Sequence, residues 1–166
     1  TSVVHKLRSK ASVRRARLSQ PLPSRKSYNL AFTSDDVRTS AWELDCSFHV
    51  SKHCREIGVQ IVHFEVSLHT EPNPLDTYVI ADFFQTTTLT FSPWKETFTI
   101  DRPSFASVSC ANLINAAPEC APHTLFTVAD PTKDGQHVEE PLHIQVWRDN
   151  SVLEVFVNGR TAISTR

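Results

Sequence analysis

The stretch LHIQVWRDNSVLEVFVNGRTAISTR, Leu142–Arg166, decides the fold of this chain. It contains three runs rich in β-branched and other apolar residues, separated by two short turn signals. Asp149-Asn150 and Asn158-Gly159 both suit tight hairpin turns, because Asp, Asn and Gly tolerate a left-handed backbone. We therefore predict an antiparallel meander of three strands: Leu142–Arg148, Ser151–Val157 and Arg160–Ser164.

The alternation within this stretch predicts which side chains are buried. Successive strand residues point to opposite faces of a sheet, so Leu142, Ile144 and Val146 share one face. The residues of the opposite, outward face are His143, Gln145 and Trp147. The middle run is apolar on both faces apart from Glu154, as expected of a central strand that is covered on both sides. We expect Val146 and Phe156 to lie in the core.

The same period of two continues upstream as far as residue 40. Trp42–Val50 alternates almost without fault, which puts its apolar residues on one face: Trp42, Leu44, Cys46, Phe48 and Val50. Further strand-like runs follow, with turn residues between them: Ile57–Leu68, Thr77–Phe84, Thr86–Phe91 and Glu96–Ile100. Short strands at this spacing predict an all-β fold, a two-sheet antiparallel β-sandwich of the lectin-like kind that spans residues 40–166.

Residues 1–39 differ from the rest of the chain in charge. Eight of the 17 basic residues lie between Thr1 and Ser27, and no acidic residue occurs before Asp35. The remainder therefore holds 9 basic against all 18 acidic residues, and the overall charge of −1 conceals a basic arm on an acidic domain. The basic residues are Lys6, Arg8, Lys10, Arg14, Arg15, Arg17, Arg25 and Lys26.

Four interpretations of this basic arm compete. An acid-free run of Lys and Arg could bind nucleic acid through phosphate charge, and its Arg- and Ser-rich composition is also typical of a mitochondrial presequence. It could equally be a connector to another domain or a solvated terminus, with room for a short helix over Val3–Ala16. No aromatic residue lies among the arginines to stack on bases, and we expect no nucleic-acid partner.

Composition bounds the class of protein. The 166 residues are 40% hydrophobic and 21% charged, which is ordinary for a globular domain. No apolar run approaches the roughly 20 residues of a membrane span, so we expect no membrane partner. Met is absent and the first residue is Thr1. This suggests a fragment, although removal of an initiator Met before Thr would give the same start.

Several short motifs resemble one known family. Val152–Gly159, VLEVFVNG, resembles the SVxEVFxNxG signature that closes the C-terminal module of glycoside hydrolase family 32, which comprises invertases, inulinases and fructosyltransferases. Thr99–Arg102 resembles the T-[IV]-D-R strand end of that module, and Trp42–Leu44 its opening strand. Leu7–Ser9 is similar to the segment that links propeller to sandwich in fungal members. Pro103 departs from the family, which carries Ser there, and should end the strand because it lacks a backbone donor.

The resemblance implies a parent enzyme in two parts. A five-bladed propeller carries a nucleophilic Asp, a transition-state-stabilising Asp and a Glu acid/base, in W-M-N-D-P-N-G, R-D-P and E-C motifs, for retaining hydrolysis. We find no such set in this chain and expect no catalytic residue here. The implied function is a non-catalytic module of a secreted enzyme acting on β-fructofuranosides such as sucrose and fructans. Its implied partners are the propeller, its substrate and other copies; no stretch here is a signal peptide.

Two short segments resemble catalytic motifs, and one further carboxylate stands alone. Pro118-Glu119-Cys120 contains Glu-Cys, but we place it in a Pro-rich loop of the sandwich without its partner motifs. Asp101-Arg102-Pro103 inverts R-D-P. Glu154 in the meander has no acid/base partner on sequence grounds, because a lone charge in a hairpin is usually solvated or paired with a cation.

Other groups of residues leave alternatives open. Trp147 on an outward face and Trp94 in a loop could stack on a sugar, which would make the chain an independent carbohydrate-binding sandwich; packing is the competing explanation. Cys110 and Cys120 could close their loop as a disulfide in a secreted parent, or remain thiols. Cys46, His49, His53 and Cys54 could suggest zinc, but the strand positions of Cys46 and His49 have opposite parity, so their side chains point to opposite faces. We therefore predict no metal and no cofactor.

Overall fold

The computed structural model describes part of the chain: residues 41–65, 68–70, 77–79, 83–102, 117–149 and 152–165, together with Arg17 and Leu22. The chain divides into two compact units, Thr1–Trp42 and Glu43–Arg166. In the first unit Arg17 and Leu22 have exposed side chains. The helix suggested for Val3–Ala16 and the Leu7–Ser9 segment lie outside the described residues.

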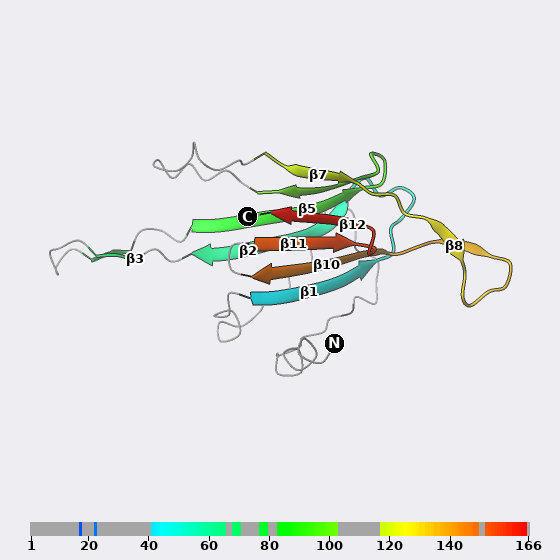
Figure 1. The fold of residues 1–166 in the computed structure, drawn as a ribbon, viewed down its shortest axis with the longest axis horizontal. Helices are drawn as coiled ribbons and strands as arrows, with labels where there is room; N and C mark the ends of the chain where they lie inside the picture. Colours follow the sequence, from blue (N-terminus) through cyan, green and yellow to red (C-terminus); the bar gives the residue numbers. More distant parts are fainter. Residues whose placement is uncertain are drawn as a thin grey trace. The chain divides into compact units, whose positions relative to one another are not determined.

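The described residues form strands and turns. No helix among them is long and apolar enough to cross a membrane. The strands, most of which are labelled in Figure 1, are β1 (Ala41–Phe48), β2 (Ile57–Glu65), β3 (Leu68–Thr70), β4 (Thr77–Val79), β5 (Phe83–Ser92), β6 (Thr97–Asp101), β7 (Glu119–Pro122), β8 (Thr127–Ala129), β9 (His137–Glu139), β10 (Leu142–Asp149), β11 (Val152–Val157) and β12 (Thr161–Thr165).

Eight of these strands build two four-stranded sheets. Sheet A has the strand order β1-β10-β11-β12 and sheet B the order β2-β5-β6-β7, with antiparallel ladders. Two short ribbons, β3–β4 and β8–β9, complete the described strands. The two sheets pack together, which confirms the all-β sandwich.

The core lies between the inward faces of the two sheets. Its sheet B residues are Leu89, Phe91, Phe98 and Ile100, and its sheet A residues are Leu142, Ile144, Val146, Leu153, Val155 and Val157. The predicted shared face of β10 is confirmed, because its burial alternates residue by residue. Burying a side chain of this size stabilises the fold by roughly 1.5–3 kcal/mol, so these ten residues hold the sheets together.

One side of the sandwich is fastened by polar side chains, and we call it the β7–β12 seam. The two strands adjoin without a backbone ladder. Thr161 Oγ1 donates to the Pro122 carbonyl (3.1 Å) at one end, and Thr165 Oγ1 donates to Glu119 Oε1 (2.7 Å) at the other. The start of β7 therefore lies beside the end of β12, and two threonine hydroxyls link sheet A to sheet B.

The opposite side, which we call the β1–β2 side, differs in chemistry. Alternation of burial along β1 and β2 confirms which residues face inward, yet these apolar side chains are only half-buried. They are Leu44, Cys46 and Phe48 of β1, and Ile57, Val59 and Ile61 of β2. The side chain of Val62, which follows, is 46% exposed.

The meander is confirmed with two corrections. β10 and β11 pair in register, with Val146 opposite Val155, but Asp149 pairs with Val152 and belongs to the ladder instead of the turn. Phe156 is not in the core, so that prediction is wrong. It is half-buried on the outward face of β11, where its ring lies 5.3 Å from that of Trp147. The core takes the opposite parity of β11 because Glu154, which shares a face with Phe156, could not be buried there at low cost.

Other boundaries also differ from the predictions. The run Thr77–Phe84 divides between β4 and the start of β5. Glu119 and Cys120 do not lie in a loop but begin β7, an edge strand of sheet B. Pro122 ends that strand, where a missing backbone donor is tolerated. β6 ends at Asp101, before Pro103, as predicted.

Candidate functional site

At the end of the Thr-Ile-Asp-Arg motif, the side chains of Arg102 and Thr165 both form hydrogen bonds with Glu119. Arg102 donates to Glu119 Oε1 at 2.8 Å, and the same oxygen accepts the Thr165 hydroxyl. Side-chain exposure is 19% for Arg102 and 33% for Glu119. The motif arginine therefore joins the end of β6 to the start of β7 and the end of β12. Glu119, which belongs to the Glu-Cys dipeptide that resembles a catalytic motif, thereby stabilises the β7–β12 seam.

The Asn-Gly turn of the closing motif is fixed by its Asn side chain. Asn158 and Gly159 both have positive φ, 49° and 63°, which only Gly and short polar residues adopt readily. Asn158 Nδ2 donates to the Pro141 carbonyl (2.9 Å), and Asn158 Oδ1 accepts from the His143 amide (2.9 Å). The turn is thereby bound to the first residues of β10.

Arg160, directly after that turn, holds the base of the β8–β9 ribbon. Its guanidinium pairs with the Glu140 carboxylate, donates to the Thr124 carbonyl (2.9 Å) and lies 4.2 Å from the centre of the Phe126 ring. Glu140 also accepts the Phe126 amide. Hydrogen bonds from Arg160 outweigh burial and lower the pKa of Glu140 to about 2. We call this group the Arg160 clamp.

His123 is buried between the seam and the core. Its Nδ1 lies 3.0 Å from Thr161 Oγ1, and its ring meets Phe91 edge-on with centroids 5.5 Å apart. Its Nε2 is buried without a hydrogen-bond partner among the described residues. Burial, and then the charge of Arg160, lower the pKa of His123, so the ring is neutral at pH 7.

The outward face of sheet A carries an aromatic pair beside polar groups, and we call it the Trp147 face. The Trp147 side chain is 41% exposed, and its ring is tilted 57° against that of Phe156. Asp45 of β1 accepts from His143 Nε2 (2.7 Å) and Gln145 Nε2 (3.2 Å). Partial burial raises the pKa of Asp45, but the hydrogen bonds from His143 and Gln145 prevail, and the pKa lies below its usual value.

The second predicted sugar-binding residue lies elsewhere. Trp94 occupies the turn between β5 and β6 of sheet B and is 73% exposed. Trp147 projects from the outward face of the other sheet. The fold therefore does not combine the two tryptophans into one site.

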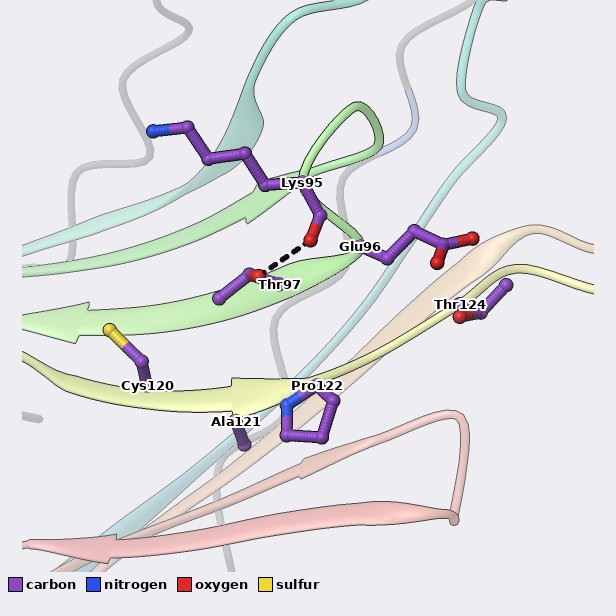
Figure 2. A pocket seen from close by; sticks show the side chains of 7 residues that line it. All are labelled: Lys95, Glu96, Thr97, Cys120, Ala121, Pro122 and Thr124. Atoms are coloured by element: carbon purple, nitrogen blue, oxygen red, sulfur yellow. Dashed lines mark hydrogen bonds between the residues drawn. The ribbon is translucent and has the colours of Figure 1, made fainter.

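A shallow groove follows Trp94 on sheet B. Figure 2 shows its lining, from the turn after β5, strands β6 and β7 and Thr124, around about 420 Å³. The lining residues are Lys95, Glu96, Thr97, Cys120, Ala121, Pro122 and Thr124. No aromatic side chain lines it, and its polar groups are exposed or half-buried. The groove offers no fixed set of polar groups that would orient a ligand.

The cysteines do not assemble a site among the described residues. Cys120 is exposed and forms no disulfide with a described cysteine, and Cys110 lies outside the described residues, so the proposed disulfide stays a prediction. The Cys46 thiol lies 3.6 Å from the Ile144 carbonyl, and burial, followed by the charge of Asp45, raises its pKa to about 12. In the described part of the chain no three His, Cys, Asp or Glu side chains are placed to hold a metal ion.

Sequence reasoning missed the polar contacts that fasten the fold. Arg160 pairs with Glu140 across 20 residues of sequence, and His123 contacts Thr161 across 38, which alternation cannot reveal. The available signal was the position of Arg160 directly after a rigid Asn-Gly turn, where the backbone fixes the direction of the side chain.

These features define the class of protein. It is a two-sheet β-sandwich that is stabilised by the side chains of its Asp-Arg and Asn-Gly motifs. The family described as "Glycosyl hydrolases family 32 C terminal" matches residues 4–166. The chain therefore belongs to this family.

Solved structures of fungal enzymes are similar to this chain. A β-fructofuranosidase of Aspergillus kawachii, complexed with glycerol, is 25% identical with a TM-score of 0.47 over 75% of this chain. A fructosyltransferase of A. japonicus is 20% identical with a TM-score of 0.40 over 76% of this chain. The chain spans 18% and 20% of those two proteins. No curated protein sequence matches this chain.

Proposed function

We propose that this chain is the non-catalytic C-terminal sandwich module of a glycoside hydrolase that acts on β-fructofuranosides such as sucrose and fructans, and that it stabilises the catalytic propeller. The observation that carries the proposal is the family match over residues 4–166. The motif residues support it, because Arg102 and Asn158 serve as structural fastenings.

Two carboxylates that are paired with arginines also support a structural role. Retaining hydrolysis requires two carboxyl groups about 5–5.5 Å apart, one of them protonated at working pH. Glu119 is paired with Arg102, and Glu140, whose pKa is about 2, is paired with Arg160. The low pKa keeps Glu140 ionised at working pH, so Glu140 is unsuited to donate a proton.

The β1–β2 side is the surface that we assign to the propeller. Its inward apolar side chains, among them Leu44 and Ile61, are half-buried, and Val62 is exposed. A neighbouring domain that covered them would gain roughly 25 cal/mol for each Å² of apolar surface removed from water. Inter-domain interfaces of about 600–1,500 Å² are usual.

The test is to express the propeller of the parent enzyme with and without this chain. We expect the propeller alone to be less stable to heat and to lose sucrose hydrolysis on storage, and the purified chain alone to release no fructose from sucrose or inulin. Sustained turnover by the chain alone, removed by Glu119→Gln or Glu154→Gln, would overturn the non-catalytic assignment. A propeller equally stable without the chain would overturn the stabilising role.

Three further parts of the proposal concern the parent protein. The basic arm, residues 1–39, connects the propeller to the sandwich; the parent is secreted; and the module contributes to homo-oligomers. In an oxidising compartment Cys110 and Cys120 could pair. Mass spectrometry of the secreted protein, with and without alkylation, would test that disulfide.

A further inference from the structure

We propose that the Trp147 face binds a neutral saccharide, a function separate from the structural role of the module. The face consists of outward-pointing residues on three adjacent strands of sheet A: Asp45, His143, Gln145, Trp147, Glu154 and Phe156. It combines a held aromatic ring with hydrogen-bonding groups that are themselves held in place.

The aromatic part of the face is preorganised. Trp147 pairs across the ladder with Glu154, and Phe156 lies diagonally next to it, with its ring 5.3 Å away. The half-buried Phe156 supports the indole from one side, while 41% of the Trp147 side chain remains exposed. An indole that is already fixed loses little conformational entropy when a sugar ring stacks on it.

The polar part lies directly beside the ring. Asp45 accepts from both His143 and Gln145, so one carboxylate fixes an imidazole and a carboxamide at the surface. Gln145 lies opposite Phe156, and Trp147 lies opposite Glu154, so polar and aromatic residues alternate across the two strands. Carboxylates and carboxamides can accept or donate paired hydrogen bonds, which matches neighbouring hydroxyl groups on a sugar ring.

The charge of the face selects for a neutral ligand. The described residues that point outward from β1, β10, β11 and β12 within the second unit include Glu43, Asp45, Asp149 and Glu154, and none of them is Lys or Arg. Such a face repels phosphate and sulfate groups. A neutral polyol meets no such repulsion, and its hydroxyl groups can donate to the carboxylates.

The neighbouring strand leaves space for a ligand. Ala162 of β12 pairs with Phe156, and Ser164 pairs with Glu154. Both β12 side chains are small and exposed. A sugar ring on the aromatic pair is therefore not obstructed from the β12 side.

The chain provides its own spectroscopic test, since it contains three Trp residues. The indole N–H signals of the 166-residue chain, assigned with Trp→Phe variants, would be followed by NMR during titration with inulin oligosaccharides, with cellohexaose, and with heparin as a polyanion. We expect a neutral saccharide to shift the Trp147 signal and leave the Trp94 signal unchanged. Heparin should shift neither signal.

Matched variants define the site. Trp147→Ala should weaken saccharide binding by roughly tenfold, as expected for the loss of one stacked aromatic ring. Gln145→Ala should weaken binding several-fold, and Trp94→Ala should leave it within about twofold. Because Trp147→Ala also removes packing on Phe156, Trp147→Phe and a thermal melt of each variant separate lost binding from lost folding.

Each outcome decides the proposal. A shift at Trp147 with either neutral saccharide, together with loss in Gln145→Ala, supports it. No shift with either saccharide, a shift at Trp94 alone, or binding of heparin alone overturns it. None of these results affects the stabilising role proposed above, which depends on the propeller experiment.

Discussion

At the β7–β12 seam, polar side chains cross between the sheets: two threonine hydroxyls and the Arg102–Glu119 pair join strands that have no backbone ladder. At the β1–β2 side, the inward residues are apolar and half-buried. A protein domain that needs no partner tends to cover its apolar surface, whereas a surface meant for a partner retains it. This contrast is the basis of our proposal that another domain covers the β1–β2 side, whereas residues of the module itself link the two sheets at the seam.

The largest effect should come from the core next to the seam. Phe91→Ala removes a buried ring that packs on His123, and it should lower the free energy of unfolding by about 3–5 kcal/mol, as cavity-forming changes do. Urea unfolding would measure it. Phe156→Ala is the control: its ring is half-buried on the outward face, and a loss of only about 1–2 kcal/mol is expected. Equal losses would contradict our placement of Phe156.

The stability of the β7–β12 seam should depend on Glu119 Oε1, which accepts from both Arg102 and Thr165. Glu119→Gln removes the charge that holds Arg102 and weakens the acceptor of Thr165, with an expected loss of about 1–3 kcal/mol. A double-mutant cycle with Thr165→Val should show coupling between the two positions. Glu139→Gln, at an exposed position on β9, should change stability by less than about 0.5 kcal/mol. Additive effects at 119 and 165 would refute a shared fastening.

Lowering the pH should reduce the free energy of unfolding of the module, because it disrupts the Arg160 clamp. The pKa of Glu140 is about 2 in the folded chain against an ordinary value of 4.5, so the folded state favours the ionised form. The stability that this gives is present above pH 4.5 and is lost as the pH falls from 4.5 through 2. Unfolding experiments across this range should show the loss, and Glu140→Gln should reduce the slope. An unchanged slope would remove Glu140 as its cause.

A second loss should begin at milder acidity. Burial lowers the pKa of His123 below 6.5, so the unfolded chain takes up this proton more readily than the folded chain. Stability should therefore fall as the pH drops below 6.5, and it should be fully present above that value. Imidazole NMR signals would give the folded pKa directly. A value above 6.5 would contradict the neutral, buried ring.

The smallest effect should appear on the β1–β2 side. Val62→Ser replaces an exposed side chain and should change the stability of the chain alone by less than about 0.5 kcal/mol. In the complete parent enzyme the same change should lower the melting temperature measurably, because a covered Val would lose its apolar contact. Val62 points outward from the edge strand β2, so an equal response of both proteins would show that the propeller does not cover the outward face of β2.

The parts of the fold that the sequence predicts are those with strict alternation. β10, β11 and β12 follow from period two and from the Asn-Gly turn. In β11 both faces are apolar, and the size of Phe156 led to the wrong face; the parity of Glu154 was the better signal. β8 and β9 are three residues long and exposed, so no burial pattern marks them.

The candidate site divides in the same way. The outward position of Trp147 follows from its parity in β10 and is confirmed. Its neighbours could not be predicted, because Asp45 contacts His143 from a strand 98 residues earlier. Local pattern fixes the direction in which a side chain points, whereas the strand order of the sheet fixes what it meets.

The fastening of Asn158 also determines how this protein ages chemically. Asn-Gly is the dipeptide most prone to spontaneous deamidation, in which the Gly amide nitrogen attacks the Asn side-chain carbonyl and ammonia leaves. Water then opens the resulting succinimide to Asp or isoaspartate. In the folded chain both ends of the Asn158 carboxamide are bound, one to Pro141 just before β10 and one to His143 within it, which restrains that attack. The unfolded chain has no such restraint. Conversion to Asp would replace the Nδ2 donor by an oxygen that faces the Pro141 carbonyl, so each molecule that deamidates while open would refold with a weakened turn. The fraction of molecules that are deamidated at Asn158 therefore increases with how often the module has unfolded.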